Sequence, residues 1–349
     1  MPILLLTVSL CLPLRMIILP KNKPQSVKYR ENQCFYCAFS RFCWQKREIL
    51  YNLTMAKVLH IFNAINPLRQ RYYALVTGKE SLIKILSEAE IAEQVYNSNA
   101  IENSTLTLEE TEKILLQIDL DRYISEREIF EAKNLARVVS YIDTKAKEQE
   151  LTLDVILLLH KMLIGNIRDD IAGRFRQTGE YVRVANHIAP APEEIAERLE
   201  KLLVTYNASS HENIIKRIAL VHLTFEYTHP FIDGNGRIGR VINNYLLIRE
   251  GFVPINIKFI DRKMYYNAFH EFSEKGASKI MEEIVGKAIT NSYHKRLAYL
   301  EGAHIMTLAE YAKKYKLSHS NLINKANRQT IEAFLEKGVW KIGVSQSKK

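Results

Sequence analysis

Residues 229–240 of the 349-residue chain read His229-Pro-Phe-Ile-Asp-Gly-Asn-Gly-Arg-Ile-Gly-Arg240. This polar, glycine-rich stretch precedes the run Val241 to Glu250, which we predict to be a helix that Gly251 ends. A loop that enters a helix N-terminus suits an anion, because unpaired backbone N–H groups and the positive end of the helix dipole face it. Gly234 and Gly236 would let the backbone come close to a phosphate. The stretch therefore predicts an anion site around which the chain is organised.

The side chains of this stretch predict its chemistry. Arg237 and Arg240 are three residues apart, on one helical face, and can hold outlying phosphate oxygens in a bidentate way. Asp233 is a hard oxygen ligand of the kind that Mg²⁺ takes when it is bound to a nucleotide. His229 can accept a proton near neutral pH, whereas His222, on an apolar helix, is interpreted as a packed core histidine. Together these residues favour phosphoryl or nucleotidyl transfer with His229 as the base.

The same residues also match a dinucleotide-binding fingerprint, since residues 234–239 read Gly-Asn-Gly-Arg-Ile-Gly. A β-like run, Val253 to Phe259, follows, and Asp261 lies near the distance expected for a ribose-binding acid. However, the fingerprint should follow a buried strand directly. Residues 228–233 instead place a proline and a carboxylate where Val or Ile belong, so we rank this alternative lower.

Two further interpretations explain less of the sequence. An EF-hand loop beginning at Asp233 would put Arg237 at a ligand position and Asn244 where a bidentate glutamate belongs. A plain glycine-rich helix start with two solvated arginines would leave His229, Asp233 and Asn235 clustered without a reason.

Composition indicates a mainly α-helical protein of about two domains. Apolar residues make up 47% of the chain and charged residues 25%, so a sizeable core can be buried. There are only 13 glycines and 9 prolines, and strong helix formers are frequent. The formal net charge of +10 favours anionic partners, such as a nucleotide or a nucleic acid.

The cysteines separate the start of the chain from the rest. All 4 of them precede residue 50, so no disulfide framework is expected in the main body, which fits a reducing cytoplasm. Cys34-x-x-Cys37 with Cys43 lacks a suitable second pair for a zinc site. We therefore expect a cytoplasmic protein.

The first 20 residues are apolar but do not predict a membrane anchor. Pro13 and Arg15 break them into runs that are short for a spanning helix, and the basic start of a signal peptide is missing. We expect no membrane partner. Residues 1–55 are expected to be an N-terminal extension, unstructured or ahead of a native start near Met55.

The 229–240 stretch resembles the signature of the Fic family, His-x-Phe-x-Asp/Glu-Gly-Asn-Gly-Arg-x-x-Arg. Every fixed position is matched, by His229, Phe231, Asp233, Gly234, Asn235, Gly236, Arg237 and Arg240. The resemblance covers about residues 90–275. It implies a Fic-type helical bundle that transfers AMP from ATP to a Ser, Thr or Tyr hydroxyl of a target protein, or of the protein itself. Fic relatives of this type often dimerise, so a homodimer is expected.

The resemblance also implies where ATP would lie. Its phosphates would meet residues 233–240, including Ile238 and Gly239, with the α-phosphate over Asn235 and the amides of residues 234–237. Asp233 would hold Mg²⁺, and His229 would take the proton from the attacking hydroxyl.

A second motif, Ser98-x-x-x-Glu102-Asn103, resembles the inhibitory motif that lies N-terminal to the core in Fic proteins. In the family its glutamate pairs with the second arginine of the signature, here Arg240, and keeps the γ-phosphate from its place. The resemblance therefore implies autoinhibition. Glu102 could also place a water molecule that removes AMP from a modified target.

Residues 171–192 have β character, and Gly179 can serve as a turn. They resemble the Gly-x-Phe/Tyr-Arg stretch and the flap hairpin of Fic proteins, which covers the nucleotide and pairs with the main chain of the target. The nucleotide-facing part of the flap would be Val184, Ala185, Asn186 and His187. Beyond the core, Tyr265 and Tyr266 resemble an aromatic pair that lies beside the adenine.

The pattern of helices predicts three segments after the extension. Residues 56–110 form an N-terminal helical region with the inhibitory helix, residues 111–300 form the Fic core, and residues 303–349 form a C-terminal unit. That unit resembles a winged helix-turn-helix, with Ser318 capping its second helix and Gly338 in the wing. Basic side chains there could meet DNA phosphates, namely those of Lys325, Arg328, Lys337 and Lys341. The alternative function is therefore a DNA-binding regulator whose Fic core senses a nucleotide.

Overall fold

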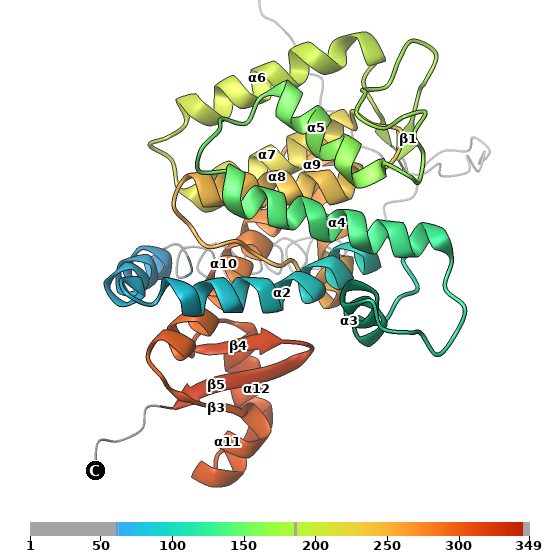
Figure 1. Ribbon diagram of the computed structural model, residues 1–349. Coiled ribbons are helices and arrows are strands. Elements are labelled where there is room, and N and C mark those ends of the chain that lie inside the picture. The colour runs from blue at the N-terminus through green and yellow to red at the C-terminus, as the bar shows by residue number, and fades with distance from the viewer. Residues whose placement is uncertain (1–60, 62, 185–186, 345–349) are drawn as a thin grey trace, which may run out of the picture. The chain divides into compact units, whose positions relative to one another are not determined.

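The computed structural model describes residues 61, 63–184 and 187–344. It is mainly α-helical with two small antiparallel sheets, as predicted (Figure 1). The predictions for residues 1–55, and for Ala185 and Asn186, lie outside the described residues. Within the described ranges, no helix combines the length and the apolar character needed to cross a membrane.

One hydrophobic core extends from Ile61 to Leu300, so the predicted N-terminal region and the predicted Fic core share their buried residues. Residues 63–76 are helical and lead into this core. The remaining helices are α2 (Glu80–Ile101), α3 (Leu108–Leu116), α4 (Glu126–Lys145), α5 (Leu153–Ile164), α6 (Ile195–Ala208), α7 (Ile214–Thr228), α8 (Asn235–Arg249), α9 (Arg262–Lys275) and α10 (Lys279–Leu300), with short 3-10 turns η1 (Pro192–Glu194) and η2 (Phe259–Asp261).

Helix α8 is the central element of this core. It is buried on nearly every side, as expected for a helix surrounded by others, and it packs against α7, α4, α5 and α2. It begins at Asn235, so the predicted start at Val241 was too late. The cause is Gly234, whose φ of 85° turns the chain into the helix in a conformation that side chains rarely adopt.

The dinucleotide-binding alternative is wrong. The segment before Gly234 is α7 followed by a loop, not a buried strand. Residues 252–258 do not form a strand, and Asp261 belongs to the short turn η2.

The predicted inhibitory motif lies at the C-terminal end of α2. Glu102 is the C-cap residue of this helix, and Asn103 follows with a φ of 72°. Asparagine tolerates this left-handed conformation better than most residues, which explains its place after the glutamate. Helix α3 then begins with a capping box formed by Thr107 and Glu110.

The flap is a very short hairpin. Strand β1 (Arg183–Val184) pairs with β2 (His187–Ile188), and Val184 lies opposite His187. Gly179 lies in a separate turn, where the Glu180 N–H donates to the Gln177 carbonyl.

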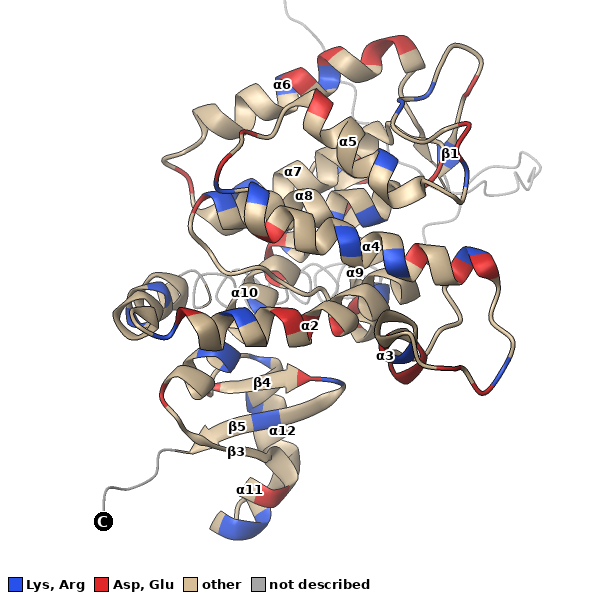
Figure 2. Ribbon diagram, in the orientation of Figure 1, with Lys and Arg blue, Asp and Glu red and all other residues tan. Residues whose placement is uncertain are grey.

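The C-terminal unit has a small hydrophobic core of its own. It consists of β3 (His304–Thr307), α11 (Leu308–Tyr315), α12 (His319–Asn327), β4 (Ala333–Glu336) and β5 (Val339–Val344), and its sheet has the order β3-β5-β4 (Figure 1). Thr307 caps α11 and Ser318 caps α12, and the β4–β5 hairpin lies where the wing was predicted. Figure 2 shows Lys and Arg at the C-terminal end of α11, where Lys313 and Lys314 occupy the last turn.

Candidate active site

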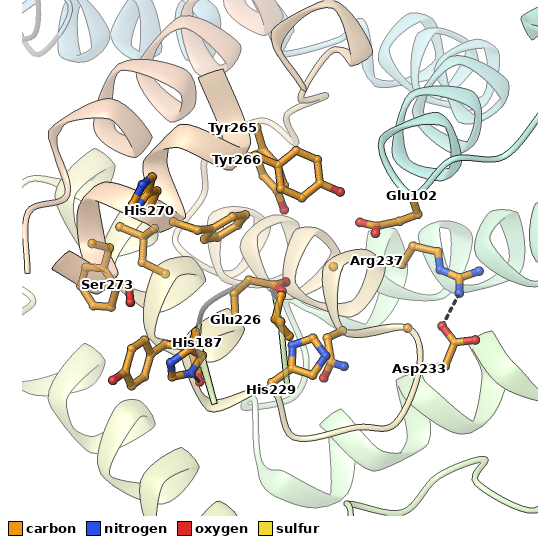
Figure 3. A pocket seen from close by; sticks show the side chains of 18 of the residues that line it. Glu102, His187, Glu226, His229, Asp233, Arg237, Tyr265, Tyr266, His270 and Ser273 are labelled. Atoms are coloured by element: carbon orange, nitrogen blue, oxygen red, sulfur yellow. Dashed lines mark hydrogen bonds and ion pairs between the residues drawn. The ribbon is translucent and has the colours of Figure 1, made fainter. Parts of the chain in front are cut away.

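A cavity of about 610 Å³ opens between the end of α2, helices α4, α7 and α9, the flap and the start of α8. Glu102, Arg237 and Asp233 lie at one end of it, and His187, His270 and Ser273 lie at the other (Figure 3). The second end is also lined by aromatic rings, namely those of Tyr227, Phe269 and Phe272. A ligand with an anionic part and an aromatic part, such as a nucleotide, fits this division.

The N-terminus of α8 lines the end of the cavity that holds Glu102, Arg237 and Asp233. The first N–H group to donate within the helix is that of Ile238, to the Gly234 carbonyl at 3.0 Å. In this part of the chain the N–H groups of Asn235, Gly236 and Arg237 therefore have no helical acceptor. The Glu102 carboxylate lies beside Gly236, so close that a Cβ on residue 236 would collide with its Oε1. A carboxylate thus lies next to the predicted anion site.

His229 stands at the end of α7, facing the cavity (Figure 3). It adopts a left-handed conformation with φ of 47°, and its N–H donates to the Phe225 carbonyl at 3.0 Å. Burial, together with the positive charge of Arg176, lowers the pKa of His229 to about 4. The imidazole is therefore neutral at pH 7 and able to accept a proton.

The loop after His229 is locked by buried side chains. Phe231 is fully buried and stacks on His160 at a centroid distance of 3.7 Å. His160 Nδ1 accepts from the Gly173 N–H at 3.0 Å, so its Nε2 carries the hydrogen and donates to the Asp233 carbonyl at 3.0 Å. The Asn235 side chain donates to and accepts from the Phe231 backbone, both at 2.9 Å. Asn235 therefore shapes the loop, and it faces a phosphate only through its N–H.

Asp233 and Arg237 are held in a group of alternating charges. Asp233 accepts from Arg127 at 2.8 Å and from Arg237 at 3.2 Å, and Arg237 also pairs with Glu131 at 3.2 Å. Burial would raise the pKa of Asp233, but the charges of Arg237 and Arg127 lower it below its ordinary value. Asp233 is therefore ionised at neutral pH.

The ionised carboxylate of Asp233 is a suitable ligand for Mg²⁺. Mg²⁺ is often held by one or two carboxylates together with the phosphates of a substrate. Among the described residues, no cluster of three or more His, Cys, Asp or Glu side chains could hold a metal by itself. The protein would thus supply a single carboxylate, and the nucleotide would supply other ligands.

Arg240 is almost completely enclosed. Its Nη2 pairs with Glu102 Oε1 at 2.9 Å and donates to the Ser98 carbonyl at 2.8 Å, while its Nε donates to Ser98 Oγ at 2.9 Å. Asn103, the third residue of the motif, instead accepts from Arg262. The structure thus pairs Glu102 with Arg240, as the resemblance implied, and adds contacts from Ser98 that were not predicted.

The remaining predicted residues have different surroundings. Val184, His187 and Tyr266 line the cavity, and His187 stacks on Tyr227 at 3.9 Å. Tyr265 also lines it but is only 1% exposed, so Tyr266 presents the more accessible ring. Ile238 and Gly239 were predicted to bind ATP, but neither lines the cavity: Ile238 is buried in the core, and Gly239 packs against His222 and Glu226.

Sequence reasoning gave no role to Arg176, although it noticed the Gly-x-Phe/Tyr-Arg stretch that contains it. Arg176 is 3% exposed and donates to the carbonyls of His229, Glu180 and Pro190 at 2.8, 2.9 and 2.9 Å. It thereby ties the segment leading to the flap to the residue at the end of α7.

Replacing Arg176 with methionine should lower the free energy of unfolding by about 2–4 kcal/mol, because buried carbonyl groups lose their donor. Arg174→Met is the matched control. Arg174 pairs with Glu180 while its side chain is 30% exposed, so its loss should cost less than about 1 kcal/mol. Denaturant unfolding of both variants checks this, and equal losses would contradict the role of Arg176.

Glu226 lies between the two ends of the cavity (Figure 3). Among the described residues none hydrogen-bonds its Oε1. Burial first, and then the negative charge of Glu102, raise the pKa of Glu226 to about 8. The carboxyl group is therefore mostly neutral at pH 7, which sequence reasoning did not reveal.

The raised pKa predicts how stability changes with pH. The folded chain keeps the Glu226 proton better than the unfolded chain, whose glutamate titrates near 4.5. The stabilising contribution is therefore complete below that pH and is lost as the pH rises to about 8. Glu226→Gln, which mimics the neutral acid, should match wild type at about pH 5 and melt at a higher temperature at about pH 9. Melting curves of wild type and Glu226→Gln at both pH values test this, and the exposed Glu197→Gln variant is the control. The same difference in melting temperature between wild type and Glu226→Gln at both pH values would contradict the prediction.

The fold and the site together define a helical protein whose central helix presents an anion site beside a neutral histidine. The family model described as Fic/DOC family matches residues 150–247.

Relatives and solved structures agree with this. "Protein adenylyltransferase Fic" of Nematostella vectensis is 32% identical over 222 residues, which are 60% of this chain and 50% of that protein. The protein of the same name from Drosophila ananassae is 33% identical over 182 residues, 50% of this chain and 35% of that protein. The chain therefore spans half or less of the length of these curated relatives.

Among solved structures, Fic-1 (residues 134–508) from C. elegans has a TM-score of 0.62 at 24% identity, covering 75% of this chain and 78% of that one. A Fic domain containing signaling protein from Bacteroides thetaiotaomicron has a TM-score of 0.61 at 24% identity, covering 68% and 97%. These likenesses show a shared fold.

Proposed function

We propose that the protein transfers AMP from ATP to a hydroxyl side chain of a target protein, itself included. The observation that carries this proposal is the placement of neutral His229 beside the α8 N-terminus, with the Glu102 carboxylate next to Gly236. The names of the relatives support the same activity.

The nucleotide would follow the division of the cavity. Its α-phosphate would meet the N–H groups at the start of α8, and its outer phosphates would extend toward Arg240 and Arg237. The base would lie at the aromatic end, where the accessible ring of Tyr266 is available for stacking. Arg237 and Arg240 both hold carboxylates in the structure, so phosphates must compete for them.

His229 would act as the base. A Ser, Thr or Tyr hydroxyl of the target attacks the α-phosphorus, its proton goes to the imidazole, and the new oxygen–phosphorus bond replaces the bond to the leaving pyrophosphate. Asp233 is the residue that would hold Mg²⁺, which neutralises negative charge on the phosphates. The target main chain would pair with the β1–β2 flap next to the cavity.

Glu102 would keep this activity low. Its carboxylate and the γ-phosphate of ATP need the same guanidinium, that of Arg240, so ATP binds without its productive geometry while Glu102 is in place. Glu102 could also position water for the reverse reaction, the removal of AMP. The expected homodimer and the cytoplasmic location rest on composition and family resemblance alone.

The type of transfer can be tested with ATP labelled either at the α- or at the γ-phosphorus. The Glu102→Gly variant is incubated with each nucleotide and Mg²⁺, and the label on protein is counted after denaturation. AMP transfer predicts label from α-labelled ATP only. Label from γ-labelled ATP would show phosphoryl transfer and would overturn the proposal.

The alternative, a DNA-binding regulator with a nucleotide-sensing core, is favoured by one observation. Helix α12 exposes Lys325, and the exposed Arg328 follows at its C-cap, so basic side chains lie on this helix as on a DNA-reading helix. Two of the other predicted phosphate contacts are engaged, since Lys337 pairs with Glu112 and Lys341 with Glu336, both at 2.7 Å. A selection of bound sequences from random DNA with the full chain tests this: a regulator predicts an enriched sequence that Lys325→Ala weakens.

A further inference from the structure

Arg240 has one partner that does not belong to the inhibitory helix. Ser98 and Glu102 contact it from α2, whereas Tyr265 contacts it from α9. Arg240 Nη1 donates to the Tyr265 hydroxyl oxygen at 3.0 Å, and the guanidinium carbon lies 5.6 Å from the centre of the tyrosine ring. If Glu102 and Ser98 withdraw, the Tyr265 contact is able to remain.

The position of the tyrosine hydrogen follows from counting donors. A guanidinium only donates, so the Tyr265 oxygen accepts from Arg240 and its own hydrogen must go elsewhere. His222 Nε2 lies 2.7 Å from that oxygen and is the acceptor. The ring hydrogen of His222 then resides on Nδ1, which faces Gly239.

Burial keeps this chain of hydrogen bonds in a single protonation state. His222 is completely buried, and burial together with the charge of Arg240 lowers its pKa to about 3. Burial likewise raises the pKa of Tyr265 above its ordinary value. Near neutral pH the histidine therefore stays a neutral acceptor, and the tyrosine stays a hydroxyl.

The ring of Tyr265 is itself fixed. It packs edge-on against Phe269 at 4.8 Å and against Tyr266 at 5.8 Å. Its hydroxyl therefore has little freedom to leave Arg240. The packed core histidine predicted from sequence is indeed buried, but it also aligns a tyrosine that the resemblance had placed beside the adenine.

We propose that His222 and Tyr265 are positioning residues that hold the Arg240 guanidinium ready for the outer phosphates of a nucleoside triphosphate once Glu102 has withdrawn. This inference rests on the proposed function, because it uses the same nucleotide site. An arginine side chain that Tyr265 already holds loses less conformational freedom when it binds a phosphate than an unrestrained one would. The preorganised side chain therefore binds the phosphate more tightly.

The proposal predicts a difference between nucleotides. Under the proposed function Arg240 would contact the outer phosphates, which AMP lacks, so loss of its alignment should weaken the binding of a triphosphate and spare that of AMP. A merely structural role would weaken both, because the cavity as a whole would loosen.

The test compares dissociation constants for α,β-methylene-ATP and for AMP, measured by calorimetry in the Glu102→Gly protein. Adding Tyr265→Phe keeps the ring and removes the hydroxyl. It should weaken the triphosphate analogue about tenfold, as expected for one hydrogen bond to a charged group, and leave AMP within about twofold.

His222 is tested in the same way with two substitutions. His222→Leu removes the acceptor and should give the same selective loss, whereas His222→Gln supplies a new acceptor and should restore most of the triphosphate binding. Tyr245→Phe is the matched control, because Tyr245 is another buried tyrosine, on α8 itself, whose hydroxyl donates to the Gln149 carbonyl. It should change neither constant.

Equal weakening of both nucleotides by Tyr265→Phe, or no weakening, would overturn the inference. A selective loss of triphosphate binding together with an absence of AMP transfer would support the inference and contradict the proposed activity. Absence of any nucleotide binding would overturn both.

Discussion

Replacing His229 with alanine is expected to lower the rate of AMP transfer by about 10²- to 10⁴-fold, the usual contribution of a general base. The imidazole lines the cavity beside the α8 N-terminus, and burial with the Arg176 charge lowers its pKa to about 4. It is thus ready to accept a proton at neutral pH.

The loss should be confined to the chemical step. His229 forms part of the loop through its backbone, whose carbonyl accepts from Arg176, so the alanine variant keeps that contact. ATP affinity should change little and the melting temperature should stay close to that of the parent. His211→Ala, at an exposed site outside the cavity, serves as control. Transfer that survives in the His229→Ala protein would remove His229 from its role.

Replacing Glu102 with glycine is expected to raise AMP transfer by about 10- to 100-fold, because it frees Arg240 from a charged hydrogen bond. The Glu102 carboxylate lies beside Gly236 at the start of α8 and pairs with Arg240 at 2.9 Å. Glycine removes both the charge and the volume from the place that the γ-phosphate needs.

A graded series makes this prediction sharper. Glu102→Gln keeps the volume and weakens the pairing, so its rate should lie between wild type and Glu102→Gly. Glu109→Gly, which removes an exposed glutamate paired with Lys113 on α3, should leave the rate unchanged. A Glu102→Gly protein that binds ATP yet transfers no faster than wild type would rule out the inhibitory role.

The sequence predicted those parts of the site that lie within one short segment. The 229–240 stretch holds the base, the loop and both arginines, and the pairing of its Arg240 with Glu102 was implied by family resemblance. The mainly helical class followed from composition. The capping residue Ser318 was predicted because a cap depends on only a few neighbouring residues.

Features that depend on distant contacts could not be predicted in this way. Arg176 and His160 act through carbonyl groups more than 50 residues away in the chain, and no local pattern shows which carbonyls will be near. The difference between Tyr265 and its neighbour arises from packing on α9. The early start of α8 depends on the left-handed conformation of Gly234, which a glycine permits but does not require.

The central claim is that a neutral His229 transfers AMP once Glu102 no longer holds Arg240. The most direct measurement is the label that α-labelled ATP and Mg²⁺ leave on purified wild type, on Glu102→Gly, and on Glu102→Gly combined with His229→Ala. The account predicts weak label on wild type, strong label on Glu102→Gly and none on the double variant. Equal label on all three proteins, or strong label on the double variant, would contradict it.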